Sequence, residues 1–114
     1  MTESTEAIVD AHLAAWNGPA GSVSLAAIYA ADVFVGEPGA AHTGHAGATA
    51  AIDALHAQVP GAVISRSGPI QTAQDLVTYS RTLGFEGQPP VASGRDVLLV
   101  REGRIIGLYV VIDS

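Results

Sequence analysis

The stretch that decides the fold runs from Gly94 to Asp113 and reads GRDVLLVREGRIIGLYVVID. Two apolar runs, 97–100 and 105–112, flank a short polar link that contains Gly103. β-Branched and aromatic residues on either side of such a link are typical of a β-hairpin with a tight turn. Neither run alternates cleanly between apolar and polar residues, so we expect both faces of this hairpin to be covered.

One carboxylate lies at the start of the first predicted hairpin strand. In a regular pleat, Asp96 shares a face with Leu98 and Val100. A carboxylate on an apolar face costs free energy unless it is paired, hydrogen-bonded or protonated. We therefore take Asp96 as a candidate site residue.

The totals limit the class of protein. The 114 residues are enough for one domain, over 1–114, and too few for two. The formal net charge is −6 and all five basic residues are arginines, which argues against a nucleic acid or an anionic membrane as partner. Without cysteine there is no disulfide or thiolate chemistry. The acidic N-terminal stretch lacks the pattern of a signal peptide or membrane span, so we expect a cytoplasmic protein.

Helices are predicted first and strands afterwards. The expected elements are helices over 5–17 and 25–31, a strand over 33–35, a break over 36–39, a loop over 40–44, a helix over 46–58, and strands over 62–67 and 76–85 before the hairpin. This order is typical of an α+β fold rather than a parallel α/β sheet. We expect a curved sheet, closed at one end by three helices, with a single deep pocket.

The segments YAADVFVGEP, GATAAIDAL, GRDVLLV and EGRIIGLYVVID, in this order of elements, resemble the nuclear-transport-factor-2-like fold. Within it the chain resembles the SnoaL-like polyketide cyclases and, more closely, the bacterial Δ5-3-ketosteroid isomerases. The resemblance covers nearly the whole chain. It implies a cone-shaped, cystatin-like α+β fold with a curved mixed or antiparallel sheet wrapped by three N-terminal helices.

The resemblance to ketosteroid isomerases also implies site residues. Their general base, an aspartate before a proline at the end of the first strand, matches Glu37. Their protonated aspartate, which donates to the substrate oxyanion, matches Asp96. The donor tyrosine of the first helix matches His12, a supporting tyrosine late in the third helix matches His56, and a third tyrosine of the network matches Tyr29. Histidine therefore stands at two tyrosine positions, and a neutral imidazole can donate one hydrogen bond.

Proton abstraction next to a carbonyl needs a base within reach of the carbon acid and donors where enolate charge develops. Glu37 can be that base if an apolar pocket raises its pKa toward neutrality, and Asp96 can donate if its site is dry enough to keep it protonated. The resemblance thus implies an enzyme without a cofactor, either an isomerase or a polyketide-cyclase-like protein. Its substrate would be apolar, carbonyl-bearing and steroid- or polyketide-like.

Other aromatic and histidine side chains are candidates for the pocket. Trp16, Tyr79 and Tyr109 are large residues that could contact substrate, with ordinary core packing as the alternative. His42 and His45 have a His-x-x-His spacing, but no Asp or Glu lies nearby to complete three ligands, so no metal is predicted. His42 remains a candidate for the pocket rim.

Non-catalytic roles stay open for four of these residues. His12 could be a helix-surface or packed histidine. Glu37 could be a solvated turn residue. Asp96 could form an exposed ion pair with Arg95 at the start of its strand. His56 could simply interact with the dipole at its helix end.

Two other functions also stay open. Limonene-epoxide-hydrolase-like epoxide opening needs an aspartate–arginine–aspartate set, and Tyr109-Val110-Val111 stands where one aspartate is expected. A non-catalytic ligand-binding or dimerisation module is the third possibility, because a fold alone does not imply a function. The apolar outward face of the hairpin predicts a homodimer in any of these cases.

Overall fold

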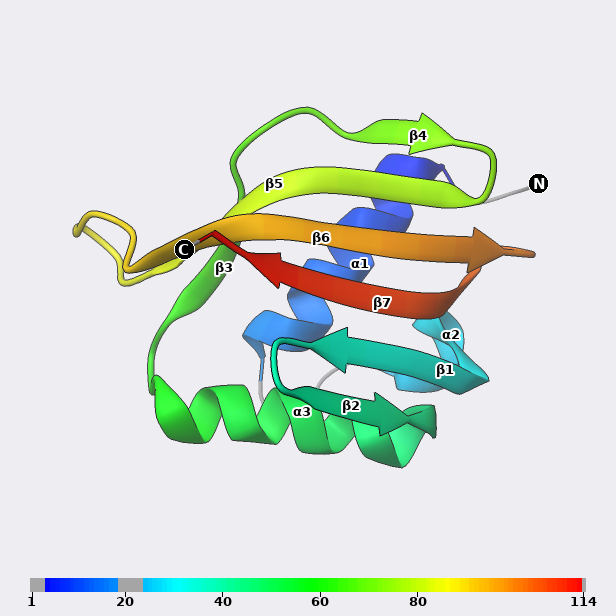
Figure 1. Cartoon of the computed structure of the whole chain (residues 1–114), viewed down its shortest axis with the longest axis horizontal. Coiled ribbons are helices and arrows are strands. Elements are labelled where there is room, and N and C mark those ends of the chain that lie inside the picture. The colour runs from blue at the N-terminus through cyan, green and yellow to red at the C-terminus, as the bar shows by residue number, and fades with distance from the viewer. Residues whose placement is uncertain (1–3, 19–23, 114) are drawn as a thin grey trace.

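The computed structural model describes residues 4–18 and 24–113 (Figure 1). In chain order the elements are α1 (Thr5–Asn17), α2 (Leu25–Ile28), β1 (Tyr29–Glu37), β2 (Ala40–Thr43), α3 (Gly44–Gln58), β3 (Val63–Arg66), β4 (Gln71–Ala73), β5 (Leu76–Gly84), β6 (Ala92–Arg101) and β7 (Arg104–Ile112). Within these residues no helix is long and apolar enough to cross a membrane.

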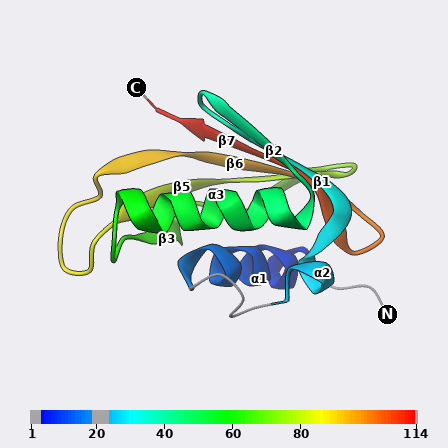
Figure 2. The same cartoon turned by 90° about the horizontal axis from the view of Figure 1, so that it is seen from below.

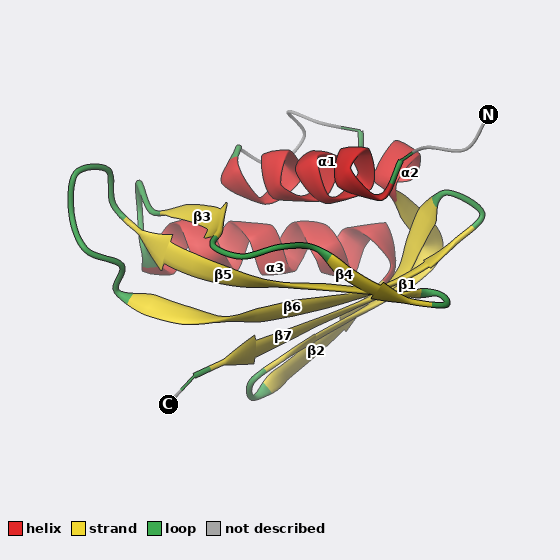
Figure 3. Ribbon diagram, turned by 90° about the horizontal axis from the view of Figure 1, so that it is seen from above, coloured by secondary structure: helices red, strands yellow, loops and turns green. Residues whose placement is uncertain are grey.

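The strands form one mixed sheet in the order β2-β1-β7-β6-β5-β3, with β4 paired to β5. β1 runs parallel to β7, whereas the other neighbours are antiparallel. Helices α1 and α3 both lie on one face of this curved, open sheet, and no helix formed by the described residues lies on the other face (Figures 2 and 3). The predicted α+β class, with helices against a curved mixed sheet, is confirmed.

The β6–β7 hairpin and its tight turn are confirmed. Leu98 pairs with Leu108, and Arg101 pairs with Arg104 around a two-residue turn. Both turn residues have positive φ, 53° at Glu102 and 79° at Gly103. Such turns match the right-handed twist of the strands they join, which explains the glycine in the link.

The structure differs from the prediction in several segments, and β1 and α3 both begin earlier than expected. The second helix ends at Ile28 instead of residue 31, because Tyr29 already pairs with Ile105 of β7. Residues 40–43 form β2 instead of a loop, and this strand pairs with the end of β1. The short strand β4 was not expected. Tyr29 pairs with a residue far along the chain, whereas β2 and β4 each form a local hairpin with the neighbouring strand across a two-residue turn.

The core lies between the helices and the inner face of the sheet. Along α1 the buried side chains recur on one face and include His12 and Trp16. On β5 and β6 the pleat buries every second residue, so that Val77, Tyr79 and Arg81 face the same side. α3 contributes mainly small side chains, which let it lie close to the sheet. Two charged residues, Arg81 and Asp96, are therefore buried among apolar neighbours.

Candidate active site

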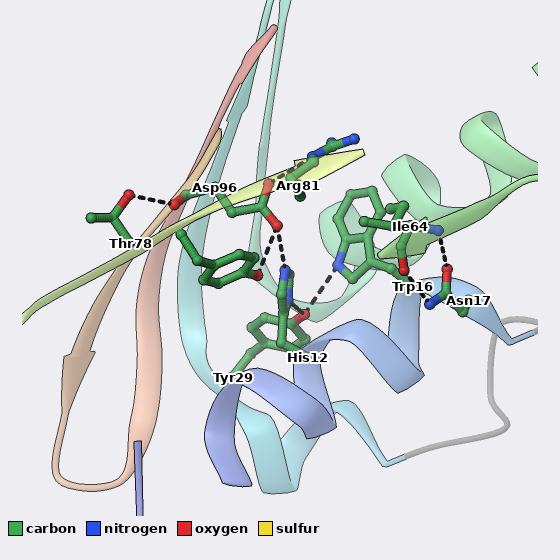
Figure 4. Close-up of polar contacts among 9 residues, drawn as sticks. His12, Trp16, Asn17, Tyr29, Ile64, Thr78, Arg81 and Asp96 are labelled. Carbon is green, nitrogen blue, oxygen red and sulfur yellow. Dashed lines mark hydrogen bonds and ion pairs between the residues drawn. The ribbon is translucent and has the colours of Figure 1, made fainter. Parts of the chain in front are cut away.

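A buried carboxylate is the centre of the polar contacts in the core. The antiparallel pairing of β5 with β6 places Asp96 directly opposite Tyr79, and the pleat brings Arg81 to the same face. The Tyr79 hydroxyl donates to Asp96 Oδ2 at 2.8 Å, and Arg81 Nε donates to Asp96 Oδ1 at 3.1 Å (Figure 4). All three residues are at most 6% exposed. A buried ion pair thus lies in the apolar core.

Helix α1 extends this cluster from the other side. His12 Nε2 lies 3.4 Å from Asp96 Oδ2, while its Nδ1 lies 2.5 Å from the Tyr29 hydroxyl oxygen. Trp16 Nε1 donates to that hydroxyl oxygen at 3.0 Å. Because an indole N–H can only donate, the Tyr29 oxygen accepts from Trp16 and its own proton can go to His12 Nδ1. The proton of His12 is then on Nε2, which faces Asp96. Each contact in this series, from Trp16 through Tyr29 and His12 to Asp96, has one donor and one acceptor.

The contacts keep Asp96 ionised. Burial alone would raise the pKa of its carboxyl group. The hydrogen bond from His12, any positive charge on that ring and the charge of Arg81 outweigh burial, and the pKa falls below its ordinary value of 3.8. The hydrogen bond from Tyr79 acts in the same direction. Burial raises the pKa of both Tyr29 and Tyr79 far above the ordinary tyrosine value, so their hydroxyl groups stay protonated.

Two interpretations of Asp96 are therefore wrong. The neutral, hydrogen-bond-donating acid is replaced by a carboxylate that accepts from its neighbours and pairs with Arg81. The exposed pair with Arg95 does not form either, because Arg95 lies on the opposite face of the sheet. There its guanidinium donates to the hydroxyl oxygens of Thr78 and Ser80.

A hollow of about 290 Å³ opens beside this cluster, between α3 and the ends of β1, β5 and β7. Its lining residues are Trp16, Glu37, Pro38, Ala51, Ala54, Leu55, Gln58, Arg81, Leu83, Val110 and Ile112. Most of these side chains are apolar. Glu37 and Arg81 are the ionisable residues among them, so the hollow, called the pocket below, brings a predicted base together with a cation.

Glu37 owes its position to the β1–β2 hairpin. It is the last residue of β1 and pairs with Ala40, while Pro38 and Gly39 (φ 81°) make the turn. Its side chain is 26% exposed, and Oε2 lies 3.7 Å from His42 Nε2. Glu37 therefore lies at a strand end next to the turn, partly exposed and with a histidine beside it. His42 lies beside Glu37 but is not among the residues that line the pocket.

Comparison with known proteins identifies the fold but no close relative. No family model and no curated protein matches the chain. A provisionally named isomerase of the SnoaL-like family from Agrobacterium tumefaciens is 24% identical, with a TM-score of 0.84 over 96% of this chain and 97% of that one. A provisionally named polyketide cyclase from Sinorhizobium meliloti is 19% identical, with a TM-score of 0.75 over 91% and 93%. A protein with a ketosteroid-isomerase-like fold from Catenulispora acidiphila, solved with trimethylamine, is 24% identical, with a TM-score of 0.78 over 94% and 85%.

This chain has the SnoaL-like fold. The recognition made from the sequence is confirmed at that level, and identities below 25% carry it no further. In the SnoaL-like fold of this chain, α1 and α3 cover one face of the curved sheet (Figure 3), and the pocket is lined from both helices and from the ends of β1, β5 and β7.

The SnoaL-like fold brings some predicted residues to the pocket and leaves others outside it. Trp16 and Glu37 line it, whereas Asp96 and His12 lie beneath it in the buried cluster. His56 lies within hydrogen-bond distance of the Trp16 carbonyl oxygen, 2.8 Å from Nε2, and so ties α3 to α1. Tyr109 is outside: it lies on the outer face of the sheet, 40% exposed.

The remaining histidine and a second hollow lie apart from the pocket. His45 Nε2 lies 2.9 Å from the Tyr29 carbonyl oxygen, where it ties the start of α3 to β1. No group of three or more His, Cys, Asp or Glu side chains that could hold a metal ion exists in the part of the chain that the structure describes. A larger hollow, of about 360 Å³, lies beside β3 and the β5–β6 loop and contains none of the predicted site residues.

Sequence reasoning missed Arg81. A signal for it was present: Arg81 follows Tyr79 by two residues in a predicted strand, so it shares a face with Val77 and Tyr79. An arginine on an inward face needs an anion, and Asp96 was already a carboxylate in need of a partner. Pairing these two requirements would have predicted the ion pair.

Proposed function

We propose that this protein is an enzyme without a cofactor that moves a proton at a carbon next to a carbonyl group in an apolar substrate. The observation that carries the proposal is the shared pocket of Glu37 and Arg81, one a proton acceptor and the other a cation, within mostly apolar walls. Similar folds that are provisionally named isomerase and polyketide cyclase are consistent with it.

Glu37 is the general base in this proposal. A base has to reach the carbon acid in a fixed orientation. Glu37 ends a paired strand, and the ring of Pro38 after it restricts the local backbone. Its carboxylate can therefore be held toward one part of the pocket instead of sampling solvent.

The pocket favours a compact substrate. Its volume of about 290 Å³ lies at the lower end of the range of roughly 300–1,000 Å³ that is typical of small-molecule sites. Trp16 and Leu55 offer apolar surface against which a ring can pack. A ketone of one or two fused rings is thus a better first substrate than a large polyketide.

The other two functions have less support. Epoxide opening needs a second carboxylate near the arginine. β7 supplies none, because its side chains toward the pocket end of the inner face are the apolar Leu108, Val110 and Ile112. Asp96 is an anion buried beneath the pocket and saturated by its neighbours. A binding module without activity would have the same pocket, so only an assay of proton transfer separates it from an enzyme.

The test uses ring opening of a benzisoxazole, a general probe of carbon-acid deprotonation. Glu37→Gln keeps the shape of the side chain but cannot accept the proton. We expect it to lower activity by about 100-fold to 10,000-fold, the usual contribution of a general base. Glu6→Gln, the same change at an exposed position on α1, is the matched control and should keep parental activity.

Parental activity in Glu37→Gln would contradict the proposal. A protein that turns over no carbon acid yet is stabilised against heat by bicyclic ketones would instead be a binding module.

A further inference from the structure

Arg81 faces two environments at once. Its Nε binds the buried Asp96 carboxylate, and its side chain is only 7% exposed, yet the residue lines the pocket. A guanidinium has five N–H donors in a fixed plane, and Asp96 takes only the one on Nε. The outer nitrogens, Nη1 and Nη2, point away from Asp96 in Figure 4.

The N–H groups on the outer nitrogens of Arg81 are free to donate hydrogen bonds. Among residues 4–18 and 24–113, Nε is the Arg81 atom that makes a hydrogen bond, and neither Nη atom has a hydrogen-bond partner. No buried polar side-chain atom in the same residues lacks a partner, so these nitrogens are accessible. Because Arg81 lines the pocket, the N–H donors on its Nη atoms are available to a ligand there.

We propose that the outer edge of the Arg81 guanidinium binds the negatively charged oxygen of the ligand, so that the pocket selects compact enolates and phenolates over the corresponding neutral compounds. The inference rests on the pocket of the proposed function and names its substrate class: carbonyl compounds acidic enough to give a stable enolate, such as cyclic 1,3-diketones and fused-ring phenols.

The buried cluster fits Arg81 for this role. Arginine keeps its charge at any ordinary pH. Asp96 is held by Tyr79 and His12 as well as by Arg81, so the guanidinium has a fixed partner before any ligand arrives. A donor oriented in advance needs no reorganisation when charge develops on the substrate. Around it the pocket walls are mostly apolar and screen that charge less than water does.

The proton-transfer step also balances in charge. The Glu37 carboxylate takes the proton from the carbon, the C–H electron pair forms the C=C bond of the enolate, and the carbonyl oxygen becomes negative. The negative charge thus moves from Glu37 to an oxygen beside Arg81. The total charge of the pocket stays the same, and the cation remains next to an anion throughout.

The test measures binding without turnover. The probe is 2-naphthol, whose neutral and ionised forms have different absorption and fluorescence spectra. The wild-type protein is expected to bind the naphtholate at least 10-fold more tightly than the naphthol, so the bound probe should ionise at a pH lower by about one unit. Arg81→Gln should remove this preference.

Two variants control for folding and for charge in general. Arg81→Gln leaves Asp96 buried without its partner, so the double variant Arg81→Gln/Asp96→Asn removes both charges and serves if the single one does not fold. The double variant should bind the neutral and the ionised form of 2-naphthol equally. Arg95→Gln removes a guanidinium from the opposite face of the same strand pair and should keep the wild-type preference.

The outcomes separate this inference from the proposed function. Equal binding of both forms by the wild type, no binding of either form at millimolar concentration, or a preference that survives in the double variant would each overturn it. Glu37→Gln is expected to lose proton transfer while keeping the preference for naphtholate. A wild type with that preference but no proton transfer would support the anion site and contradict the proposed reaction.

Discussion

Arg81 and Arg95 lie on neighbouring strands but on opposite faces of the sheet. Arg81, on β5, is 6% exposed and pairs with a carboxylate. Arg95, on β6, is half-buried and donates to two neutral hydroxyl groups at 3.2 and 3.1 Å. The pleat alone assigns them to different environments. The inner arginine belongs to a charged core cluster that opens into a pocket, whereas the outer one ties two strands together at the surface.

The largest predicted difference between the two faces is in stability. Asp96→Ala leaves Arg81 as an uncompensated buried charge, and breaking a buried pair in this way typically costs about 3–5 kcal/mol. Arg95→Ala removes hydrogen bonds to neutral, partly buried hydroxyl groups, worth about 0.5–1.5 kcal/mol each. Urea unfolding of the two variants measures the difference. Equal losses would mean that the inner pair is no more important to the fold than the outer contacts.

A smaller effect is expected in the acid dependence of stability. The pKa of Asp96 is lower in the folded protein than its ordinary value of 3.8, so its contribution is complete above that pH and is lost as the pH falls toward the folded-state pKa. Asp96→Asn has no such group and should lose less stability than the wild type in this acid range. Asp53→Asn, at an exposed position on α3, is the control and should follow the wild-type curve. An Asp96→Asn curve parallel to the wild type below pH 3.8 would contradict the charged state of Asp96.

The smallest expected effect on the pocket comes from the outer face. Phe34, Tyr109 and Val111 are 38%, 40% and 52% exposed there, and the rings of Phe34 and Tyr109 lie 5.5 Å apart. We predict that this apolar surface joins two copies of the chain. Sedimentation should show a dimer at micromolar concentration, and Tyr109→Ser/Val111→Ser should shift it to monomer with naphtholate binding unchanged. A wild-type monomer would show that the surface has another role.

The sequence predicted the helices and strands better than it predicted which strands pair with each other. The hairpin around Gly103 and the helices before residue 58 follow from local patterns of apolar residues, turns and breaks. The pairing of Tyr29 with Ile105 of β7 joins residues far apart in the sequence, so the second helix was predicted too long. The β1–β2 hairpin is local, with its turn at Pro38 and Gly39, but 36–39 was taken as a break between elements, so residues 40–43 were read as a loop.

The sequence predicted which residues lie at the candidate site better than it predicted their protonation states and partners. Glu37 and Trp16 line the pocket, and Asp96 and His12 meet in the core. The charge of Asp96 was predicted wrongly because the resemblance supplied a neutral acid, and the partner that ionises it, Arg81, lies 15 residues away. A carboxyl group on an apolar face is compatible with either protonation state, and here the cation on the same face, Arg81, decides between them.

The account depends most directly on whether Glu37 removes a proton from carbon. Exchange of the acidic C–H protons of 2-tetralone with D₂O, followed by NMR, detects that step without requiring any later isomerisation or ring closure. We predict that the wild type accelerates exchange, that Glu37→Gln loses at least about 100-fold of the acceleration, and that Glu6→Gln retains all of it. Exchange by Glu37→Gln as fast as by the wild type would contradict the account.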